Sequence, residues 1–331
     1  MAQGAGALVI SLDFELYWGV RDKKTIESYR ENLLGERQAV PGMLNLFRNY
    51  GVHATWATVG FLFFRTREEL KKNIPTELPQ YHRRGLSPYE CLNQIGEGEE
   101  DDLFHYAPSM IELIQSYPHQ EIGTHTFSHY YCLEPGQDRN TFREDLKAAV
   151  KTAENLYKIP IRSLVFPRNQ FNEDYLQVCR DLGIHAYRGN QRSWVYKPVN
   201  GEEENLSRRA IRLLDNYFNL TGHHAHSWKT RASAPMDIPA SRFLRPYSRK
   251  WRLFEPLRLS RILEGLDYAA KHDKIFHLWW HPHNFGKNLS ENLDFLENIL
   301  RHFSRLKKEN GMRSLNMGEV SQEMMLMMRA S

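Results

Sequence analysis

The sequence of 331 residues is poor in cysteine and lacks a long hydrophobic run. Its three cysteines are too few and too far apart for a disulfide framework, so we expect reduced thiols in a cytoplasmic protein. They are Cys91, Cys132 and Cys179. No apolar stretch approaches the length that a membrane-spanning helix needs. The N-terminal segment has no basic region followed by an apolar one, which argues against a signal peptide.

Strong charge of either sign is also missing. The formal net charge is +4, which is too small to indicate a nucleic-acid partner, so we expect none. Hydrophobic residues make up 41% of the chain and charged residues 25%, as is typical of a soluble globular protein. A chain of this length can bury a substantial core. We expect residues 1–331 to form a single domain.

Apolar runs of strand length alternate with helical patterns, which favours an α/β fold with parallel strands. The expected strands are Ala7–Glu15, His53–Gly60, Glu121–Ile122, Ser163–Pro167, His185–Arg188 and Ile275–Trp280. We expect a helix over residues 40–50 with Pro41 in its first turn, and another that opens at a capping box over residues 141–144. Two irregular stretches, near 64–105 and 193–251, are expected to be insertions at the rim of a site.

Four of the expected strands lead into polar side chains. These are Asp13 and Glu15, His125 and His129, Arg168, and His281. Ligands bind at the carboxyl ends of strands in parallel α/β proteins, so we expect these side chains to share one site. If a helical turn begins after Gly123, the imidazoles of His125 and His129 lie on one face of it and can hold one divalent metal.

Five segments that span most of the chain resemble, in order, the motifs of the polysaccharide deacetylase family, the carbohydrate esterases with a NodB homology domain. They are Ser11–Glu15, Ala54–Gly60, Glu121–His129, Phe166–Gln170 and Leu278–His281. The resemblance implies a distorted, incomplete (β/α) barrel, for which we expect about seven strands, with a metal-dependent N-deacetylase site. Such a hydrolase would remove an N-acyl group, expected to be N-acetyl, from a sugar in the biosynthesis of a cell-surface polysaccharide such as O-antigen or capsule.

Two departures from the family's motifs leave alternatives open. Phe14 separates the two acids of the first motif, which are usually adjacent in the family, so either Asp13 or Glu15 could bind the metal. Arg168 follows the proline of its motif instead of preceding it, so Arg162 is an alternative to it.

The chemistry of amide hydrolysis suggests a role for each candidate. The expected ligands of one divalent metal, for which we favour zinc, are Glu15, His125 and His129. Asp13 is then the expected general base, oriented and kept ionised by Arg168. His281 is the expected general acid that protonates the leaving amine, and His283 is its rival.

Substrate contacts are less clearly indicated. Trp280 could stack on a sugar ring, His283 could line the rim, and Arg245 could bind an anionic group. Arg245 belongs to a basic series over residues 242–252, which is either a solvated face or a site for phosphate. Together with the two insertions, this series favours a small or terminal N-acylated sugar on an anionic carrier, such as a nucleotide sugar or a lipid diphosphate.

Two other functions fit the same residues. An amidase of this fold could hydrolyse another small amide, such as a formamide or a ureide. A protein with an inactive site could bind a glycan without cleaving it, although the full set of acids and histidines argues against that reading.

Overall fold

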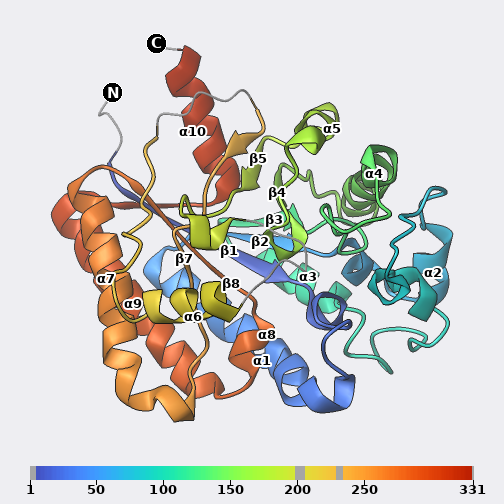
Figure 1. Cartoon of the computed structure of the whole chain (residues 1–331), viewed down its shortest axis with the longest axis horizontal. Helices are drawn as coiled ribbons and strands as arrows, with labels where there is room; N and C mark the ends of the chain where they lie inside the picture. The colour runs from blue at the N-terminus through green and yellow to red at the C-terminus, as the bar shows by residue number, and fades with distance from the viewer. Residues whose placement is uncertain (1–4, 198–205, 229–233, 330–331) are drawn as a thin grey trace.

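The computed structural model describes residues 5–197, 206–228 and 234–329. Within these residues nine strands form one sheet, and all the pairings between them are parallel (Figure 1). The order is β6-β5-β4-β3-β2-β1-β8-β7, and β9 pairs with β1. The strands are β1 (Ala7–Phe14), β2 (Ala54–Thr58), β3 (Gln120–Thr124), β4 (Ser163–Val165), β5 (Ala186–Arg188), β6 (Met236–Asp237), β7 (Arg242–Phe243), β8 (Ile275–Trp280) and β9 (Arg313–Leu315).

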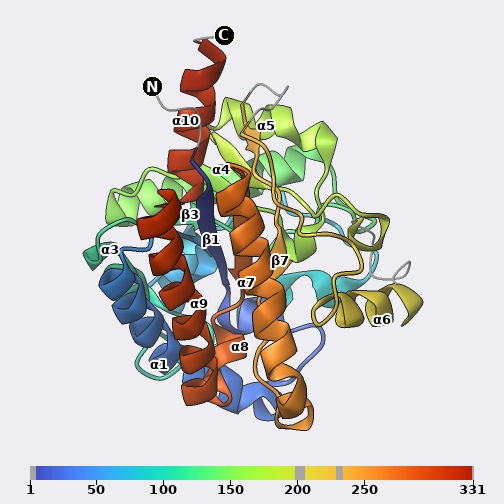
Figure 2. The same ribbon diagram turned by 90° about the vertical axis from the view of Figure 1, so that its left-hand side faces the viewer.

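Helices surround this sheet. Those of the described residues are α1 (Ile26–Tyr50), α2 (Arg67–Lys72), α3 (Pro108–Ser116), α4 (Arg139–Tyr157), α5 (Leu176–Asp181), α6 (Leu206–Asp215), α7 (Glu255–Lys271), α8 (His283–Gly286), α9 (Leu289–Asn310) and α10 (Met317–Arg329). Figure 2 shows α1, α9 and α7 side by side, in keeping with the contacts that α9 makes with both of the others. The predicted α/β class and incomplete barrel are confirmed. The sheet has nine strands instead of about seven, and the strands that were not expected are β6, β7 and β9, which have two or three residues each.

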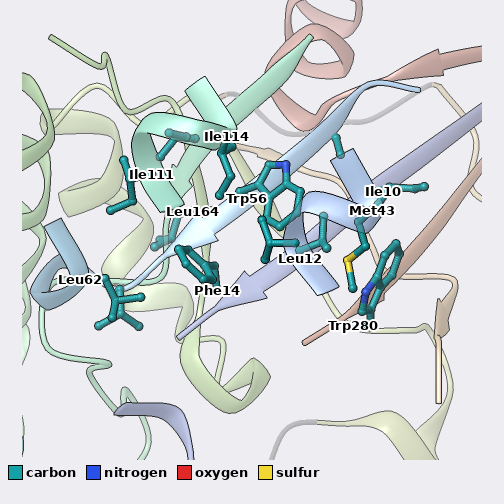
Figure 3. Packing of buried hydrophobic residues seen from close by; sticks show 14 of the residues in the cluster. Ile10, Leu12, Phe14, Met43, Trp56, Leu62, Ile111, Ile114, Leu164 and Trp280 are labelled. Atoms are coloured by element: carbon teal, nitrogen blue, oxygen red, sulfur yellow. The ribbon is translucent and has the colours of Figure 1, made fainter. Parts of the chain in front are cut away.

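The core lies between the sheet and the helices that cover it. Every residue of β1 is buried, and its alternate side chains Ile10, Leu12 and Phe14 pack with Trp56 of β2 and Trp280 of β8 (Figure 3). Burying each large apolar side chain contributes roughly 1.5–3 kcal/mol. The alternation that sends these side chains to the core sends the intervening residues of β1 to the interior of the partial barrel.

Two helices begin earlier than the sequence suggested. The prediction that a helix starts beside Pro41 is wrong, because α1 starts after the cap Thr25 and contains Pro41 in its interior. It ends as expected at Gly51, which adopts a left-handed conformation with φ of 61°. The prediction of a capping box opening at Thr141 is also wrong. Asp138 is the cap of α4, and its carboxylate accepts hydrogen bonds from the backbone N–H groups of residues 140 and 141.

The first expected insertion supports the histidine segment. Between residues 64 and 105 it contains α2 and short 3₁₀ turns. Tyr81 from this stretch packs with Leu86 and Tyr131, and its hydroxyl oxygen accepts a hydrogen bond from the Tyr131 N–H at 2.9 Å. The insertion therefore holds the chain just beyond His129.

The second expected insertion is only partly irregular. It contains α6, and it also supplies β6 and β7 to the sheet. Arg242, which was predicted to belong to a solvated or phosphate-binding series, is buried at the start of β7 and pairs with buried Asp215. The description of the basic series as one exposed face is therefore wrong at Arg242.

Candidate active site

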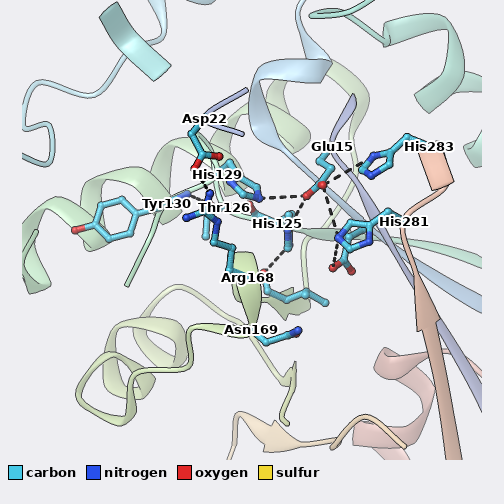
Figure 4. Close-up of polar contacts among 12 residues, drawn as sticks. Glu15, Asp22, His125, Thr126, His129, Tyr130, Arg168, Asn169, His281 and His283 are labelled. Atoms are coloured by element: carbon cyan, nitrogen blue, oxygen red, sulfur yellow. Dashed lines mark hydrogen bonds and ion pairs between the residues drawn. The ribbon is translucent and has the colours of Figure 1, made fainter. Parts of the chain in front are cut away.

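The carboxyl end of β1 meets the two candidate histidines. Glu15 follows β1 directly, and its Oε2 lies 3.1 Å from His129 Nε2 and 3.3 Å from His125 Nε2 (Figure 4). All three side chains are buried, and they form a group of potential metal ligands. Asp13, two residues earlier, points to the same interior. The structure thus gathers the three predicted metal ligands around one point.

The two histidines converge through a loop and not through a helical turn. The expectation of a helix after Gly123 is wrong, because β3 runs on to Thr124 and is followed by left-handed residues at Thr126 (φ 64°) and His129 (φ 58°). The Asp145 carboxylate of α4 accepts hydrogen bonds from two backbone N–H groups between these residues. This buried carboxylate holds the reversal that turns His129 back toward His125.

The hydrogen bonding of His125 shows why this group suits a cation. Its Nδ1 lies 2.9 Å from the Val165 carbonyl oxygen, which can only accept, so Nδ1 carries the proton of the neutral ring. The lone pair of Nε2 then faces the Glu15 carboxylate oxygen, which is also an acceptor. Two acceptors at this distance repel each other unless a proton or a cation lies between them. Among the described residues, neither this Nε2 nor Nδ1 of His129 has a hydrogen-bond partner.

The protonation states agree with a ligand role. Burial lowers the pKa of His129 to about 4, so its ring is neutral at physiological pH. Burial also raises the pKa of Glu15, but the interactions with His281, His125 and His129 outweigh that effect and hold the pKa well below its usual range. Two imidazoles and one carboxylate are a donor set that divalent zinc favours. The residues present therefore fit a metal site.

Arg188 is the partner of Asp13, and sequence reasoning missed it. Its Nη1 and Nη2 donate to the two carboxylate oxygens of Asp13 at 2.6 and 2.7 Å, and Nη2 also donates to Asn169 Oδ1 at 3.0 Å. Burial alone would raise the pKa of Asp13, but the Arg188 charge outweighs it and the pKa is lowered. The signal was available, since Arg188 ends the expected strand His185–Arg188 as the other candidates end theirs.

The predicted pairing of Arg168 with Asp13 is wrong. Arg168 forms an ion pair with Asp22 and lies over the Tyr131 ring at 4.3 Å. Tyr131 in turn contacts the edge of the His129 ring, so Arg168 supports the wall of the site from behind that histidine. The alternative, Arg162, is exposed and precedes β4, at the opposite edge of the sheet.

His281 and His283 both approach the two carboxylates, from different depths. His281 Nε2 lies 3.7 Å from Asp13 Oδ2 and 3.6 Å from Glu15 Oε1, and its side chain is 24% exposed. His283 Nδ1 lies 3.9 Å from Glu15 Oε1 and is buried. Burial and the neighbouring His281 lower the pKa of His283 to about 3. His281 is therefore the histidine that a substrate can reach.

The two other residues expected to bind substrate lie elsewhere. Trp280 is fully buried and packs against Phe47 and Phe285, so the expectation that it stacks on a sugar is wrong. Its neighbour Trp279 points the other way, toward the ring of His281. No described contact joins the Arg245 side chain to the Glu15 group, and its backbone carbonyl accepts a hydrogen bond from a buried arginine of α7.

A second group of possible metal ligands lies at the amino edge of the sheet. It consists of His53, His119 and Glu319. His53 Nδ1 is 2.7 Å from a Glu319 oxygen, and the His53 and His119 rings are stacked with their centroids 4.0 Å apart. His119 is exposed to solvent.

Comparison with known proteins finds a family that part of the chain resembles. Residues 31–187 match the family model described as polysaccharide deacetylase. The matched segment is similar to this family. The predicted resemblance is thereby confirmed, and the matched segment contains β2 to β4 with the two histidines and Arg168. No curated protein sequence matches the chain.

Several solved structures share the fold of this chain. A Mycobacterium smegmatis protein that carries the name polysaccharide deacetylase is 12% identical and has a TM-score of 0.59, over 99% of this chain and 93% of that one. One from Pseudomonas aeruginosa is 11% identical with a TM-score of 0.53, over 96% and 89%. A 4-alpha-glucanotransferase from Thermococcus litoralis is 10% identical with a TM-score of 0.52, over 96% and 40%. At these identities the likeness concerns the fold alone.

Among the described residues, no helix is long and apolar enough to cross a membrane.

Proposed function

We propose that this protein is a metal-dependent hydrolase that removes an N-acetyl group from a sugar. One observation carries the proposal: the group of Glu15, His125 and His129 lies beside a second buried carboxylate, Asp13, which Arg188 holds apart from it. One carboxylate is thus available to bind a metal while the other stays free to move a proton. The match of residues 31–187 to the polysaccharide deacetylase family model supports the same reaction.

Glu15, His125 and His129 would hold the metal, for which we propose zinc. A divalent cation at such a site acidifies water and polarises an amide carbonyl. His125 is fixed for this task by its hydrogen bond to the Val165 carbonyl, which leaves Nε2 as the ligand atom. His129 depends on the loop reversal that Asp145 stabilises.

Asp13 and His281 move the protons. Asp13, kept ionised by Arg188, accepts a proton from the attacking water. His281 then donates a proton to the nitrogen of the leaving amine, because an amide anion is a very poor leaving group. The exposure of His281 supports this role over that of His283, whose buried ring is neutral. A positioned acid or base of this kind contributes about a hundredfold or more to the rate.

A cavity beside the site supports a substrate with an anionic carrier. It has a volume of about 400 Å³ and lies beyond the carboxyl ends of β5 and β6. Trp194 on its rim is 66% exposed, which suits stacking on a sugar ring, and Arg192 and Lys197 supply positive charge for phosphate. Asn190 in its lining donates to the Asn169 carbonyl, next to the group that binds Arg188. These residues replace Trp280 and Arg245 as the proposed substrate contacts.

We place the reaction in the cytoplasm, before a cell-surface polysaccharide is exported. The three free cysteines support this, since they form no disulfide. The substrate we favour is a small or terminal N-acetylated sugar on a nucleotide or lipid diphosphate.

The test is acetate release by the zinc-loaded protein. A carrier-linked N-acetyl sugar and a neutral N-acetylglucosamine oligomer are compared at low and at high salt. Preference for the carrier-linked sugar that weakens with salt supports the proposal. Equal hydrolysis of the neutral oligomer would refute the proposal that the sugar is attached to an anionic carrier. If no N-acetyl sugar releases acetate but a formamide or ureide is hydrolysed, the deacetylase assignment is wrong and the amidase takes its place.

A further inference from the structure

The segment between β7 and α7 exposes large apolar side chains at its tip. It ends in the 3₁₀ helix η8 (Arg249–Phe254), in which Leu253 is 82%, Trp251 42% and Phe254 41% exposed. Large apolar side chains that are exposed together on a folded protein mark a site that binds a membrane or another protein. Figures 1 and 2 show this turn at the foot of α7, at the lower end of both views.

A neighbouring turn extends the same surface. The Tyr217 ring, which follows α6, contacts the rings of Trp251 and Phe254 with centroids 5.9 and 6.1 Å apart. The exposed side chains of Phe218 and Leu220 come next in the chain. We call the residues 217–220 and 249–254 together the η8 patch.

Positive charge surrounds the apolar tip. Arg249, Lys250 and Arg252 are exposed, and within the described residues none of them forms an ion pair or a side-chain hydrogen bond. The nearest acid in sequence, Glu255, is already paired with Arg258. The η8 patch therefore presents uncompensated cations next to its aromatic and aliphatic side chains.

This combination fits an anionic lipid surface better than a protein partner. Tryptophan, phenylalanine and leucine insert into the boundary between headgroups and acyl chains, while lysine and arginine reach the headgroups. Lysine is depleted at protein interfaces, where a buried ammonium is costly. We infer that the η8 patch docks the protein reversibly on an anionic bilayer, with Leu253 and Trp251 inserted between lipids.

The position of the η8 patch links docking to the active site. A segment that leads from a parallel strand into the next helix lies at the carboxyl edge of the sheet, which is also the edge that carries Glu15 and His281. Docking would therefore bring the site to the membrane surface, where a lipid-diphosphate carrier would be held. That consequence depends on the proposed function, whereas the docking itself does not.

The test is cosedimentation of the full chain with vesicles, which needs no enzymatic activity. Vesicles of phosphatidylcholine alone are compared with vesicles that also contain phosphatidylglycerol. We expect binding to the anionic vesicles, weakened by salt. The triple change Arg249→Gln, Lys250→Gln, Arg252→Gln should weaken it about a hundredfold at low salt, and Leu253→Ser with Trp251→Ser about tenfold or more.

Matched controls come from the opposite edge. Lys271, Lys307 and Lys308 are exposed cations at the ends of α7 and α9, and changing all three to glutamine should leave binding unchanged. Leu326→Ser, at an exposed position of α10, is the apolar control. Circular dichroism of each variant checks that it is folded.

No binding to anionic vesicles, or equal loss of binding in the control variants, overturns the inference. It is likewise overturned if Leu253→Ser instead dissolves a dimer seen by sedimentation without vesicles.

Discussion

The two edges of the sheet carry the same residue types in two different states. Each edge has one glutamate and two histidines close enough to share a metal ion. At the carboxyl edge, Glu15 and its histidines are buried, and two of their ring nitrogens have no hydrogen-bond partner among the described residues. At the amino edge, His53 is hydrogen-bonded to Glu319, and His119 lies exposed on its face.

The contacts of the amino-edge group are explained by their role in stabilising the fold. Glu319 lies in the first turn of α10, where its carboxylate accepts the Asn316 N–H while the Asn316 side chain accepts the Glu319 N–H. This reciprocal pair caps the helix, and His53 adds a third bond to the same carboxylate. His119 is exposed, so water can solvate its ring nitrogens without a cation. Composition and spacing alone cannot separate the two groups, whereas burial and the partner of each atom can.

The largest effect is expected from the free carboxylate of the carboxyl edge. Asp13→Asn should lower kcat about a hundredfold or more while the protein retains its metal, because the proton acceptor is lost and the ligands are not. Steady-state kinetics with elemental analysis measures both. Glu319→Gln at the amino edge is the matched control and should leave kcat unchanged. Normal turnover by the Asp13 variant would exclude its role as the base.

Two arginines at the carboxyl edge differ in the carboxylate that each of them binds. Arg188→Lys should lower kcat roughly 10- to 100-fold, because lysine keeps the charge but cannot bind both Asp13 oxygens and Asn169 together. Arg168 donates one described hydrogen bond to Asp22, which lies outside the proposed proton path. Arg168→Lys keeps the positive charge there and should change kcat by less than about twofold. Equal losses in the two variants would mean that Asp13 is not specially positioned by Arg188.

These two arginines also show what the sequence could predict. The rule that chemistry collects at strand ends found Asp13, Glu15, His125 and His281, and applied to β5 it would have found Arg188. The motif of the family contains Arg168 and not Arg188, so the resemblance indicates the wrong arginine. The side-chain alternation of β8 would similarly have excluded Trp280, since Trp279 shares the face of His281.

Other features could not be read from the sequence. The left-handed conformation at Thr126 depends on Asp145, a carboxylate from a helix that follows, so no local pattern indicates it. The strands β6 and β7 have two residues each and exist only because β5 and β8 offer edges for pairing. The extension of α1 through Pro41 likewise depends on packing against α8 and α9, which offsets the lost hydrogen bond.

A smaller effect is expected at the amino edge, on stability alone. His53→Ala should lower the free energy of unfolding by about 1 kcal/mol, since it removes a partly exposed hydrogen bond to the Glu319 carboxylate. Urea denaturation measures this change. The kcat of the variant should equal that of the wild type, and a loss of activity would show that the two edges are coupled.

The smallest effect concerns pH at the same edge. Burial raises the pKa of Glu121 above 4.5, although hydrogen bonds from Ser163, Thr55 and the Gly318 N–H oppose the shift. The folded protein therefore binds this proton more tightly than the unfolded chain does. Its stabilising contribution is complete below about pH 4.5 and is lost as pH rises through the folded-state pKa. The free energy of unfolding of the wild type should therefore fall, relative to that of Glu121→Gln, as pH rises from about 4.5 through the folded-state pKa. A constant difference across pH would contradict the shift.

The central claim, that the carboxyl edge alone is a metal site, is tested most directly by metal content. The dialysed wild type, His125→Ala and His53→Ala are each titrated with zinc by calorimetry and analysed for bound metal. We predict one zinc ion per chain in the wild type and in His53→Ala, and at least tenfold weaker binding in His125→Ala. The account would be contradicted if His125→Ala bound as much zinc as the wild type. It would also be contradicted if His53→Ala lost the bound zinc.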